Sequence, residues 1–443
     1  MTGRYKAYPE YKESGVDWLH DIPEHWKTMP VGRCYHRVKR TGYEAEELLS
    51  VYRDYGVVPK SSRDDNNNKP SDDLSPYQLV CENNLVMNKM KAWQGSIAIS
   101  EYRGIVSPAY FVYEPFNHTE SIVYPKYVHY LLRHPIYITQ YMSRSKGIRV
   151  NQWDLDPESF QSIELLLPLK EEQQKIINFL DHETAKIDTL ITKQEKLIEL
   201  LKEKRQAVIS HAVTKGLNPD APMKDSGVEW LGEVPEHWGV VKIKWKTQTT
   251  SGGTPSTSKY EVYYEGGDVP WIRTTDLNNG KLLSTPVSIT PKALEDTACS
   301  ILPKDSVLLA MYGGAGSIGK HSLLMFEATI NQAVCGIYPS SSFEPEFLHY
   351  FYEFYRPFWM INAAGTRKDP NIGQDHIKEG KVSLPTREEQ TAIVSYINKI
   401  LNLLDKLNDK AVEAIELAKE RKTALISAVV TGKIDVRDWQ GEA

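Results

Sequence analysis

Residues 14–26 read SGVDWLHDIPEHW, and residues 226–238 read SGVEWLGEVPEHW. Nine of the thirteen positions are identical at an offset of 226 − 14 = 212, which chance does not produce. An internal repeat of this kind decides the fold of the whole chain, because each copy forms a structural unit of its own. The sequence therefore predicts a tandem duplication.

The repeat extends outward from this frame. PKYVHY at residues 125–130 parallels PEFLHY at residues 345–350. From Pro168 onward the offset becomes 385 − 168 = 217, and it holds without a gap to Thr214. Because the offset drifts only in the segments before this point, we expect surface loops of variable length there.

Each copy ends in a long charged segment whose apolar residues recur at three- and four-residue spacing. The pattern predicts helices over 168–216 and 385–434, each ending near a glycine. Thr386 with Glu389 fits a capping box at the start of the second helix. The same register is apolar in both copies, as a coiled-coil seam requires. The expected seam contains Ile176, Leu180, Ile187, Leu190, Leu197, Leu201, Ile393, Ile397, Leu404, Leu407, Ala414 and Ala418.

Two such helices in one chain predict that their apolar seams face each other. An antiparallel pair related by a pseudo-two-fold axis covers both stripes with a single interface. The alternative is that each helix packs on its own globular segment. The length of the shared register favours the paired arrangement.

The segments before the helices read as mixed structure with short strands at 96–99, 109–113, 306–311 and 333–338, and aromatic-rich helices at 126–142 and 346–361. The expected fold class is α+β, with two similar mixed α/β domains separated by a pair of long antiparallel helices, related by pseudo-two-fold symmetry from the duplication. The expected boundaries are 1–167 for the first domain with its N-terminal hook, 168–216 for the first helix, 217–225 for a linker, 226–384 for the second domain, 385–434 for the second helix and 435–443 for a C-terminal tail.

The composition is that of an ordinary soluble protein. With 443 residues, 25% charged and 41% hydrophobic, fibrous and wholly disordered classes are excluded, and two or three domains are expected. No apolar run approaches the ~20 residues that span a bilayer, and the N-terminus lacks a signal peptide. The four cysteines lie far apart, so we expect a reduced, cytoplasmic location without a metal site. The net charge of −5 means that any DNA binding must come from local patches.

The stretch Gly313–Lys320, GGAGSIGK, has the spacing of a phosphate-binding loop. However, His321 follows where a serine or threonine should hold magnesium, and the sister copy has AWQGSIA at 92–98. These two differences favour a tight glycine-rich turn over a nucleotide site.

The histidines His25 and His237 lie in the repeated PEHW. Acid–base catalysis is one interpretation. The repeated tryptophan frame favours the other, a docking hook that buries indoles. Metalloprotease and hydrolase motifs and the Asn-Pro-Pro-Tyr methyltransferase motif do not occur, so the sequence predicts no catalytic centre and a protein that is not an enzyme.

Basic residues occur at matched places in both copies and suggest a repeated DNA-facing surface. Lysine and arginine would contact phosphates, while arginine, asparagine and glutamine would read base edges. For any single residue, ordinary solvated charge is the alternative. The candidates are Arg33, Arg37, Lys39, Lys89, Lys91, Arg144, Lys146, Arg149, Asn151, Lys242, Lys244, Arg273, Lys320, Arg367, Lys368 and Asn371.

The repeated frame, two LP-x-x-x-EQ helix starts and the helix ends AVTKGL and VVTGKIDV together resemble the specificity subunit of type I restriction–modification systems. The helix starts are Leu167, Pro168, Glu172 and Gln173, and Leu384, Pro385, Glu389 and Gln390. The resemblance covers essentially the whole chain. It implies two target recognition domains, held apart by an antiparallel coiled coil.

The resemblance also implies a function. Each domain would read one half of a split, asymmetric DNA target, two methyltransferase subunits would bind the helical regions, and two restriction–translocase subunits would join for cleavage. S-adenosylmethionine, ATP and magnesium would belong to these partners and not to this chain. A structural coiled-coil adaptor and a nucleotide-binding enzyme that uses Gly314–Lys320 are the alternatives. The adaptor predicts no salt-dependent DNA affinity, and the enzyme predicts nucleotide affinity in the isolated chain.

Overall fold

The structure is a computed structural model that describes residues 5–53, 55–63, 70–149, 152–312, 316–363 and 372–441. The chain forms two compact units: unit 1 comprises residues 1–194 and 413–443, and unit 2 comprises residues 195–412. Two long helices, α6 (Lys170–Lys215) and α11 (Arg387–Val430), each contribute one part to each unit. Within the described ranges, no helix is both long and apolar enough to cross a membrane.

A four-stranded antiparallel sheet forms the centre of unit 1. Its order is β4 (Tyr35–Val38), β11 (Tyr110–Pro115), β8 (Leu85–Asn88) and β9 (Ile97–Ile99). Alternate residues of β8 face opposite sides, as the pleat requires. Leu85 and Met87 pack in one core with Tyr127 of α3 (Pro125–Leu132), while Val86 packs in another with Val51.

Smaller elements complete unit 1. The paired strands are β1 (Tyr11–Glu13) with β2 (Asp21–Pro23), β3 (Lys27–Pro30) with β14 (Glu164–Leu167), β5 (Leu49–Tyr52) with β6 (Gly56–Pro59), β7 (Gln78–Val80) with β10 (Gly104–Val106), and β12 (Ser145–Arg149) with β13 (Gln152–Leu155). The short helices are α1 (Val31–Cys34), α2 (Thr119–Ile122), α4 (Pro135–Arg144) and α5 (Pro157–Gln161).

Unit 2 repeats this topology. Its main sheet has the order β18 (Thr249–Ser251), β25 (Val334–Ile337), β22 (Val307–Ala310), β23 (His321–Leu324) and β20 (Lys281–Leu282). The first four strands correspond to β4, β11, β8 and β9, with the same antiparallel neighbours. The duplication read in the sequence is therefore a duplication of strand order, with β20 added on the edge.

The remaining elements of unit 2 extend the correspondence. The paired strands β15 (Met223–Asp225) and β16 (Glu233–Pro235) match β1 and β2, and β17 (Gly239–Lys242) with β26 (Lys381–Leu384) match β3 and β14. A three-stranded sheet contains β21 (Ser288–Ile289), β19 (Val269–Ile272) and β24 (Thr329–Ile330). The helices are α7 (Tyr260–Tyr263), α8 (Pro291–Asp296), α9 (Pro345–Ala363) and α10 (Gln374–Glu379).

The expected strands are confirmed as β9, β11, β22 and β25, but two local expectations are wrong. The helix expected over 126–142 is interrupted before Pro135, because proline starts a new helix, α4, whose N-cap is His134. The linker expected over 217–225 ends in strand β15, where Met223 pairs with Pro235. Both errors concern short elements in polar or proline-containing stretches, where the sequence pattern does not indicate a helix or strand boundary.

The repeated frame docks on the start of α6 in unit 1. The indole nitrogen of the fully buried Trp26 donates to Glu172 at 3.1 Å, and the ring nitrogen of His25 lies 2.7 Å from the other carboxylate oxygen. The hydroxyl of Tyr8 also donates to Glu172, at 2.6 Å. The hook interpretation of His25 is therefore confirmed, since its ring holds the helix start.

Unit 2 contains the same contact. The indole of Trp238 donates to Glu389 at 3.2 Å, and His237 lies 3.1 Å from both oxygens of that carboxylate. The backbone nitrogen of Glu389 donates to the hydroxyl of Thr386 at 3.3 Å, so one half of the expected capping box is present. The Glu389 side chain binds the hook instead of completing the box.

The glutamine after each of these glutamates anchors the helix to the loop before the aromatic-rich helix. Gln173 is buried and accepts from the backbone nitrogen of Tyr124 at 2.9 Å. Gln390 is buried and accepts from the backbone nitrogen of Glu344 at 2.7 Å. The repeated Glu-Gln pair therefore fixes each long helix to the unit that precedes it in sequence.

The end of the other long helix packs on the same hook. In unit 1, Gly432 follows α11, and its backbone oxygen accepts from the hydroxyl of Tyr11 at 3.0 Å. A Cβ on Gly432 would lie 3.4 Å from the Trp26 ring. In unit 2, Gly216 follows α6 and lies against Trp238. Each hook thus binds the start of one long helix and the end of the other.

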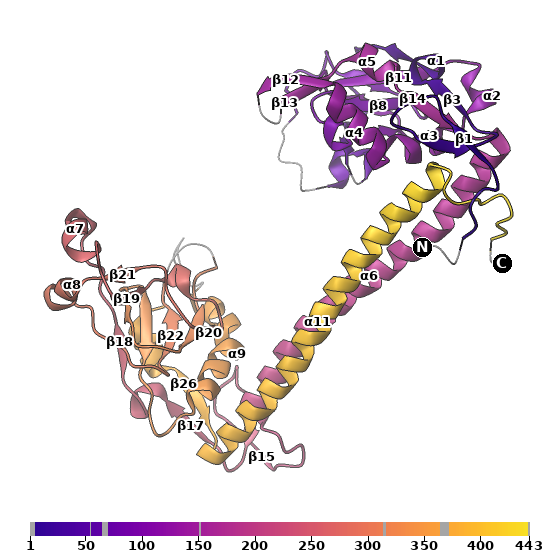
Figure 1. The fold of residues 1–443 in the computed structure, drawn as a ribbon. Helices are drawn as coiled ribbons and strands as arrows, with labels where there is room; N and C mark the ends of the chain where they lie inside the picture. Colours follow the sequence, from indigo (N-terminus) through magenta and orange to yellow (C-terminus); the bar gives the residue numbers. More distant parts are fainter. Residues whose placement is uncertain are drawn as a thin grey trace. The chain divides into compact units, whose positions relative to one another are not determined.

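Helix segments run antiparallel within each unit. In unit 1, Lys175 donates to the backbone oxygen of Arg437 at 2.6 Å, and Lys422 lies 2.7 Å from Asp188. Tyr5 and Trp439 both pack edge-on against Phe179, at 5.4 and 5.5 Å between ring centres, so the two ends of the described chain lie side by side on α6 (Figure 1).

The corresponding segments of α6 and α11 in unit 2 are also antiparallel to each other. Arg205 of α6 lies 3.1 Å from Asp405 of α11, and Ser383, just before α11, donates to the backbone oxygen of Val213 at 2.7 Å. A continuous coiled coil over the full length of both helices stays a prediction.

The expected seam needs a correction in its register. Of the twelve expected residues, Leu190, Leu197 and Leu407 are exposed. Seven are buried, namely Ile176, Leu180, Ile187, Ile393, Ile397, Leu404 and Ala418, and Leu201 and Ala414 are half-buried. In α6 the half-buried Ile191 and Ile198 take the places expected for Leu190 and Leu197. Adjacent apolar residues at 190–191 and 197–198 make both registers compatible with the sequence.

Candidate DNA-binding surfaces

One end of the central sheet of unit 1 collects basic residues. In the register, Val112 of β11 pairs with Val38 and Tyr110 pairs with Asn88. The end of β4, the start of β11 and the end of β8 therefore lie together. Lys39 directly follows β4, and Lys89 and Lys91 follow β8, so three expected residues share this end. The basic sheet end of unit 1 is defined here by these three lysines.

The hairpin β12–β13 is joined to this basic sheet end. The backbone nitrogen of Leu155 donates to the backbone oxygen of Lys89 at 3.2 Å, and the Lys89 ammonium lies 3.3 Å from Asp154. The rings of Trp93 and Trp153 pack 5.0 Å apart between the two elements. This ring contact holds the hairpin against the sheet end whose lysines can contact DNA phosphates.

Sequence reasoning missed these two tryptophans, because neither lies in the repeated motifs. Their contact joins the 3-10 helix at Ala92–Gln94 to strand β13. Only the fold brings residues 93 and 153 together. One sequence signal could have indicated these two tryptophans: each lies in a segment where the two copies differ.

The other candidates of unit 1 are spread more widely. Arg33 and Lys146 are exposed, and the guanidinium of Arg37 stacks 4.1 Å from the ring centre of Phe111. Arg144 donates to the hydroxyl of Ser162 at 3.1 Å. Arg149 is the last residue of β12, and Asn151 lies outside the described residues.

Unit 2 has a corresponding sheet end. The backbone nitrogen of Ile372 donates to the oxygen of Met311 at 2.8 Å, which is the counterpart of the bond between Leu155 and Lys89. Lys320 precedes β23 at this end, where the Ala310 nitrogen donates to its backbone oxygen at 2.8 Å. The polar sheet end of unit 2 is defined here by Lys320, Arg273, Asn331 and Gln332.

A second pair of strands contributes to the polar sheet end of unit 2. Arg273 directly follows β19, and Asn331 directly follows β24. The backbone nitrogen of Asn331 donates to the backbone oxygen of Ile272 at 2.9 Å. The Arg273 guanidinium lies 3.1 Å from Asp276, whose proximity raises the pKa of Arg273. The exposed Gln332 accepts from the hydroxyl of Thr254. Sequence reasoning did not identify Asn331 or Gln332, because neither lies in a basic stretch that is matched in the two copies.

Lys242 and Lys244 belong to a local ion pair. Lys242 lies 2.7 Å from Glu379, and Lys244 contacts the second oxygen of the same carboxylate. The two lysines lower the pKa of Glu379 to about 2. The structure therefore gives both lysines a role within the chain. Arg367, Lys368 and Asn371 lie outside the described residues.

The described part of the glycine-rich stretch, residues 316–320, leads into strand β23, which pairs antiparallel with β22. Residues 313–315, which include Gly314, lie outside the described residues, but Gly319 has a φ of +69° and strand β23 follows Lys320. A phosphate-binding loop is followed by a helix whose N-terminus faces the phosphates. The expected tight turn is confirmed for its described part.

The comparisons with known proteins agree with the duplicated fold. The family model described as the type I restriction modification DNA specificity domain matches residues 26–200 and again 235–417. Together these ranges cover most of the chain. Each match begins in the hook of one copy and ends within the long helix after it.

Individual proteins match along nearly the full length. The MjaVIII specificity subunit of Methanocaldococcus jannaschii is 27% identical over 97% of this chain and 98% of its own. The EcoKI specificity subunit of Escherichia coli is 20% identical over 95% of this chain and 91% of its own. Both are specificity subunits of type I restriction enzymes.

Solved structures show the same fold. A chain from a study of assembly and conformational transition of the type I R-M system has a TM-score of 0.68 at 15% identity and covers 93% of this chain and 99% of its own. The HsdS subunit from Thermoanaerobacter tengcongensis has a TM-score of 0.55 at 16% identity, with coverage of 93% and 98%. The chain therefore belongs to the family of DNA specificity subunits of type I restriction–modification systems.

Proposed function

We propose that each unit reads one half of a bipartite, gapped and asymmetric DNA target. The observation that carries this proposal is the repeated sheet end. The same strand order, closed by the same backbone hydrogen bond, occurs in both units. Its side chains differ: Lys89 and Lys91 beside Trp93 in one unit, Arg273 and Gln332 in the other. One scaffold with two sets of side chains suits two different half-sites.

The two sheet ends supply different kinds of contact. Lysine ammonium groups form salt-dependent contacts to phosphates, which position a protein without reading sequence. Glutamine and asparagine amides form paired hydrogen bonds to adenine edges in the major groove. Gln332 and Asn331 are therefore the base-reading candidates in unit 2, and Lys39, Lys91 and Lys320 are phosphate contacts.

We propose further that the long helices dock two methyltransferase subunits and set the distance between half-sites. The exposed leucines support this role, because on each helix their spacing places them near one face, and a contiguous exposed apolar patch marks an interaction surface. Leu190, Leu197 and Leu200 on α6 and Leu403, Leu407 and Leu417 on α11 are exposed. Two restriction–translocase subunits complete the assembly. S-adenosylmethionine, ATP and magnesium bind to the partner subunits, and this chain has no catalytic role.

An exchange of one recognition segment tests the proposal. Residues 27–167 are replaced by the equivalent segment of a relative with a known target, and methylated adenines are mapped in a host that also carries the methyltransferase partner. We expect one half-site to change and the other half-site and the spacer to remain. The reciprocal exchange of residues 239–384 is the matched control and should change only the other half-site. If both half-sites or neither change, modular reading is wrong.

A further inference from the structure

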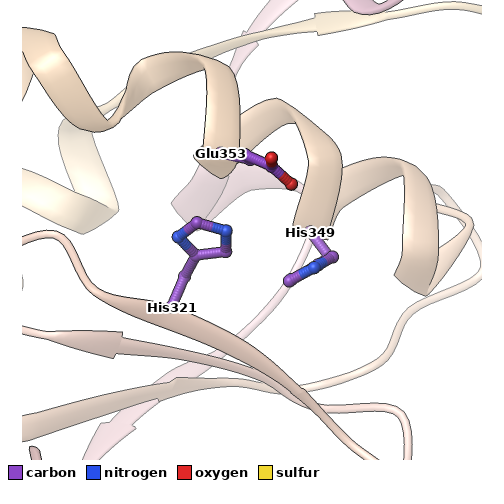
Figure 2. A group of neighbouring side chains, drawn as sticks. All are labelled: His321, His349 and Glu353. Carbon is purple, nitrogen blue, oxygen red and sulfur yellow. The ribbon is translucent and has the colours of Figure 1, made fainter. Parts of the chain in front are cut away.

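Three side chains that can bind a metal meet inside unit 2, and the first of them directly follows Lys320 of the polar sheet end. His321 opens strand β23, and His349 and Glu353 lie one turn apart on α9 (Figure 2). One ligand atom of each lies within 4.8 Å of the others. Residues four apart on a helix share one face, so His349 and Glu353 both turn toward the strand. Figure 2 shows the three side chains gathered between the strand and the helix.

Both histidines are buried and have an unused ring nitrogen. His321 is 1% exposed and His349 is 3% exposed. The Nε2 atom of His321 and the Nδ1 atom of His349 have no hydrogen-bond partner among the described residues. A buried polar atom without a partner costs free energy, so such an atom calls for an explanation.

The protonation of His321 leaves Nε2 free to act as a ligand. Its Nδ1 faces the backbone oxygen of Gly319 at 3.4 Å, which favours the proton on Nδ1 and a lone pair on Nε2. Metal-bound histidines usually donate their second nitrogen to a carbonyl or carboxylate in this way.

The equivalent position of unit 1 has an arginine instead of the carboxylate ligand. His129 corresponds to His349 in the repeat of PKYVHY and PEFLHY, and four residues later Arg133 takes the place of Glu353. The guanidinium of Arg133 lies 2.8 Å from Nε2 of His129. A cation at that position repels a second cation, whereas the carboxylate of Glu353 attracts one.

We propose that His321, His349 and Glu353 form a binding site for a divalent transition metal, with zinc as the preferred ion. Two imidazoles and one carboxylate are a ligand set that zinc uses, with a water in the fourth position. Ligands of tetrahedral zinc lie about 3.4 Å apart, so small side-chain rotations close the site. The site rests on unit 2 alone and does not depend on the proposed function.

The neighbouring arginine is compatible with a bound cation. Arg205 approaches Glu353 at 3.8 Å through Nε, while its Nη1 lies 3.1 Å from Asp405. The guanidinium can therefore remain on Asp405 when Glu353 turns to the metal. A bound ion would tie β23, and with it the turn that carries Lys320, to α9.

The experiment uses the purified full chain, treated with a chelator and titrated with zinc chloride by calorimetry. We expect one zinc per chain and a rise in the thermal unfolding temperature with zinc concentration. Glu353→Gln keeps the shape of the side chain and should weaken zinc binding more than about 10-fold. His349→Gln should do the same. His129→Gln, at the equivalent position of unit 1, is the matched control and should leave zinc affinity unchanged.

Cobalt distinguishes this site from the cysteines. Cobalt bound by nitrogen and oxygen should show the visible bands of a tetrahedral site without a sulfur charge-transfer band. A sulfur band would assign the ion to a cysteine and overturn the proposal. It is also overturned if the wild-type chain binds no zinc, or if Glu353→Gln binds it as tightly as wild type. Glu353→Gln decides alone if His349→Gln does not fold. None of these results bears on half-site reading, which the methylation map tests separately.

Discussion

The indole of Trp26 donates a hydrogen bond to the carboxylate of Glu172, 3.1 Å away and 146 residues later in the chain. The same pair recurs as Trp238 and Glu389 at 3.2 Å. The two copies differ in burial, because the side chain of Glu172 is 5% exposed and that of Glu389 is 37% exposed. The same contact therefore occurs twice in one chain, once with a buried glutamate and once with a solvent-exposed one.

This difference predicts unequal effects of one substitution. Glu172→Gln removes a buried charge that accepts three hydrogen bonds, and we expect unit 1 to lose about 1–3 kcal/mol of its free energy of unfolding. Glu389→Gln should cost less than about 1 kcal/mol, because water screens the exposed carboxylate. Urea unfolding monitored by circular dichroism measures both. Equal losses for the two variants would contradict this explanation.

The glycines that end the long helices give a second matched pair. Gly432 and Gly216 have φ of +73° and +76°, where an alanine costs about 1–2 kcal/mol. A Cβ on Gly432 would also come within 2.5 Å of the Pro23 ring, whereas a Cβ on Gly216 would meet Trp238 at 3.1 Å. Gly432→Ala should therefore lower the thermal unfolding temperature more than Gly216→Ala. A larger decrease for Gly216→Ala would show that the hook of unit 1 shifts at little cost to make room for the new methyl group.

The large features of the fold could be predicted from the sequence. The repeat and its offsets indicated two units, and the three–four spacing indicated α6 and α11. The burial of single helix residues could not be predicted, because Leu190 and Ile191 are both apolar and only packing selects Ile191 for the seam. A repeat shows that two segments share a fold, but it does not show which side chains face each other.

The sites were harder to predict for the same reason. Trp93 and Trp153 meet only because β13 folds back on the segment after β8. His321 lies 28 residues before His349, and a histidine four residues before a glutamate on a helix has no specificity by itself. The expectation of no metal site came from cysteine spacing, which says nothing about histidines that the fold brings together.

A third prediction concerns the long helices as a ruler. Four residues inserted between Gln194 and Glu195 add about 6 Å to α6 and rotate the part of the helix beyond the insertion by slightly more than one turn. We expect the spacer between half-sites to lengthen by about one or two base pairs, or DNA binding to be lost. Methylation mapping measures the spacer. Four residues inserted after Asn218, in the exposed segment beyond α6, are the control and should change nothing. A normal spacer with full affinity in the helix variant would exclude the ruler.

A fourth prediction concerns acid stability. Burial, with the nearby Lys433, lowers the pKa of His134 to about 4, below the usual value of about 6.5. The unfolded chain then binds more protons between these two pH values, so stability is full above about pH 6.5 and falls as pH drops to about 4. Asparagine also caps helices, so His134→Asn should keep the N-cap of α4 and remove the titrating ring.

In His134→Asn, the free energy of unfolding of unit 1 should vary less with pH between about 6.5 and 4. The slope should fall by up to about 1.4 kcal/mol per pH unit, which is the contribution of one proton. Urea unfolding at a series of pH values measures the slope. Part of the dependence should persist, because burial also lowers the pKa of His129 in the same unit. A slope identical to wild type would show that His134 is protonated without cost in the folded chain.

The last prediction separates the two interpretations of the glycine-rich turn through Lys320. Lys320 precedes strand β23 at the polar sheet end of unit 2, and His321 occupies the place of a magnesium-binding hydroxyl. We expect the isolated chain to bind no ATP. Lys320→Ala should weaken DNA binding by the assembled methyltransferase complex almost equally for cognate and non-cognate DNA. It should also reduce the slope of log affinity against log salt by roughly one unit, since one phosphate contact is lost.

Lys304 provides the control for Lys320, because it is exposed and precedes β22 at the opposite end of the same antiparallel pair of strands. Lys304→Ala removes the same charge from the same unit, so a loss of affinity through net charge alone would affect both variants equally. Fluorescence anisotropy at several salt concentrations measures the two slopes. Stoichiometric ATP binding that is lost in Lys320→Ala would restore the nucleotide interpretation. If Lys320→Ala and Lys304→Ala both bind DNA as wild type does, Lys320 is a solvated turn residue, and the phosphate contacts of unit 2 must come from other residues.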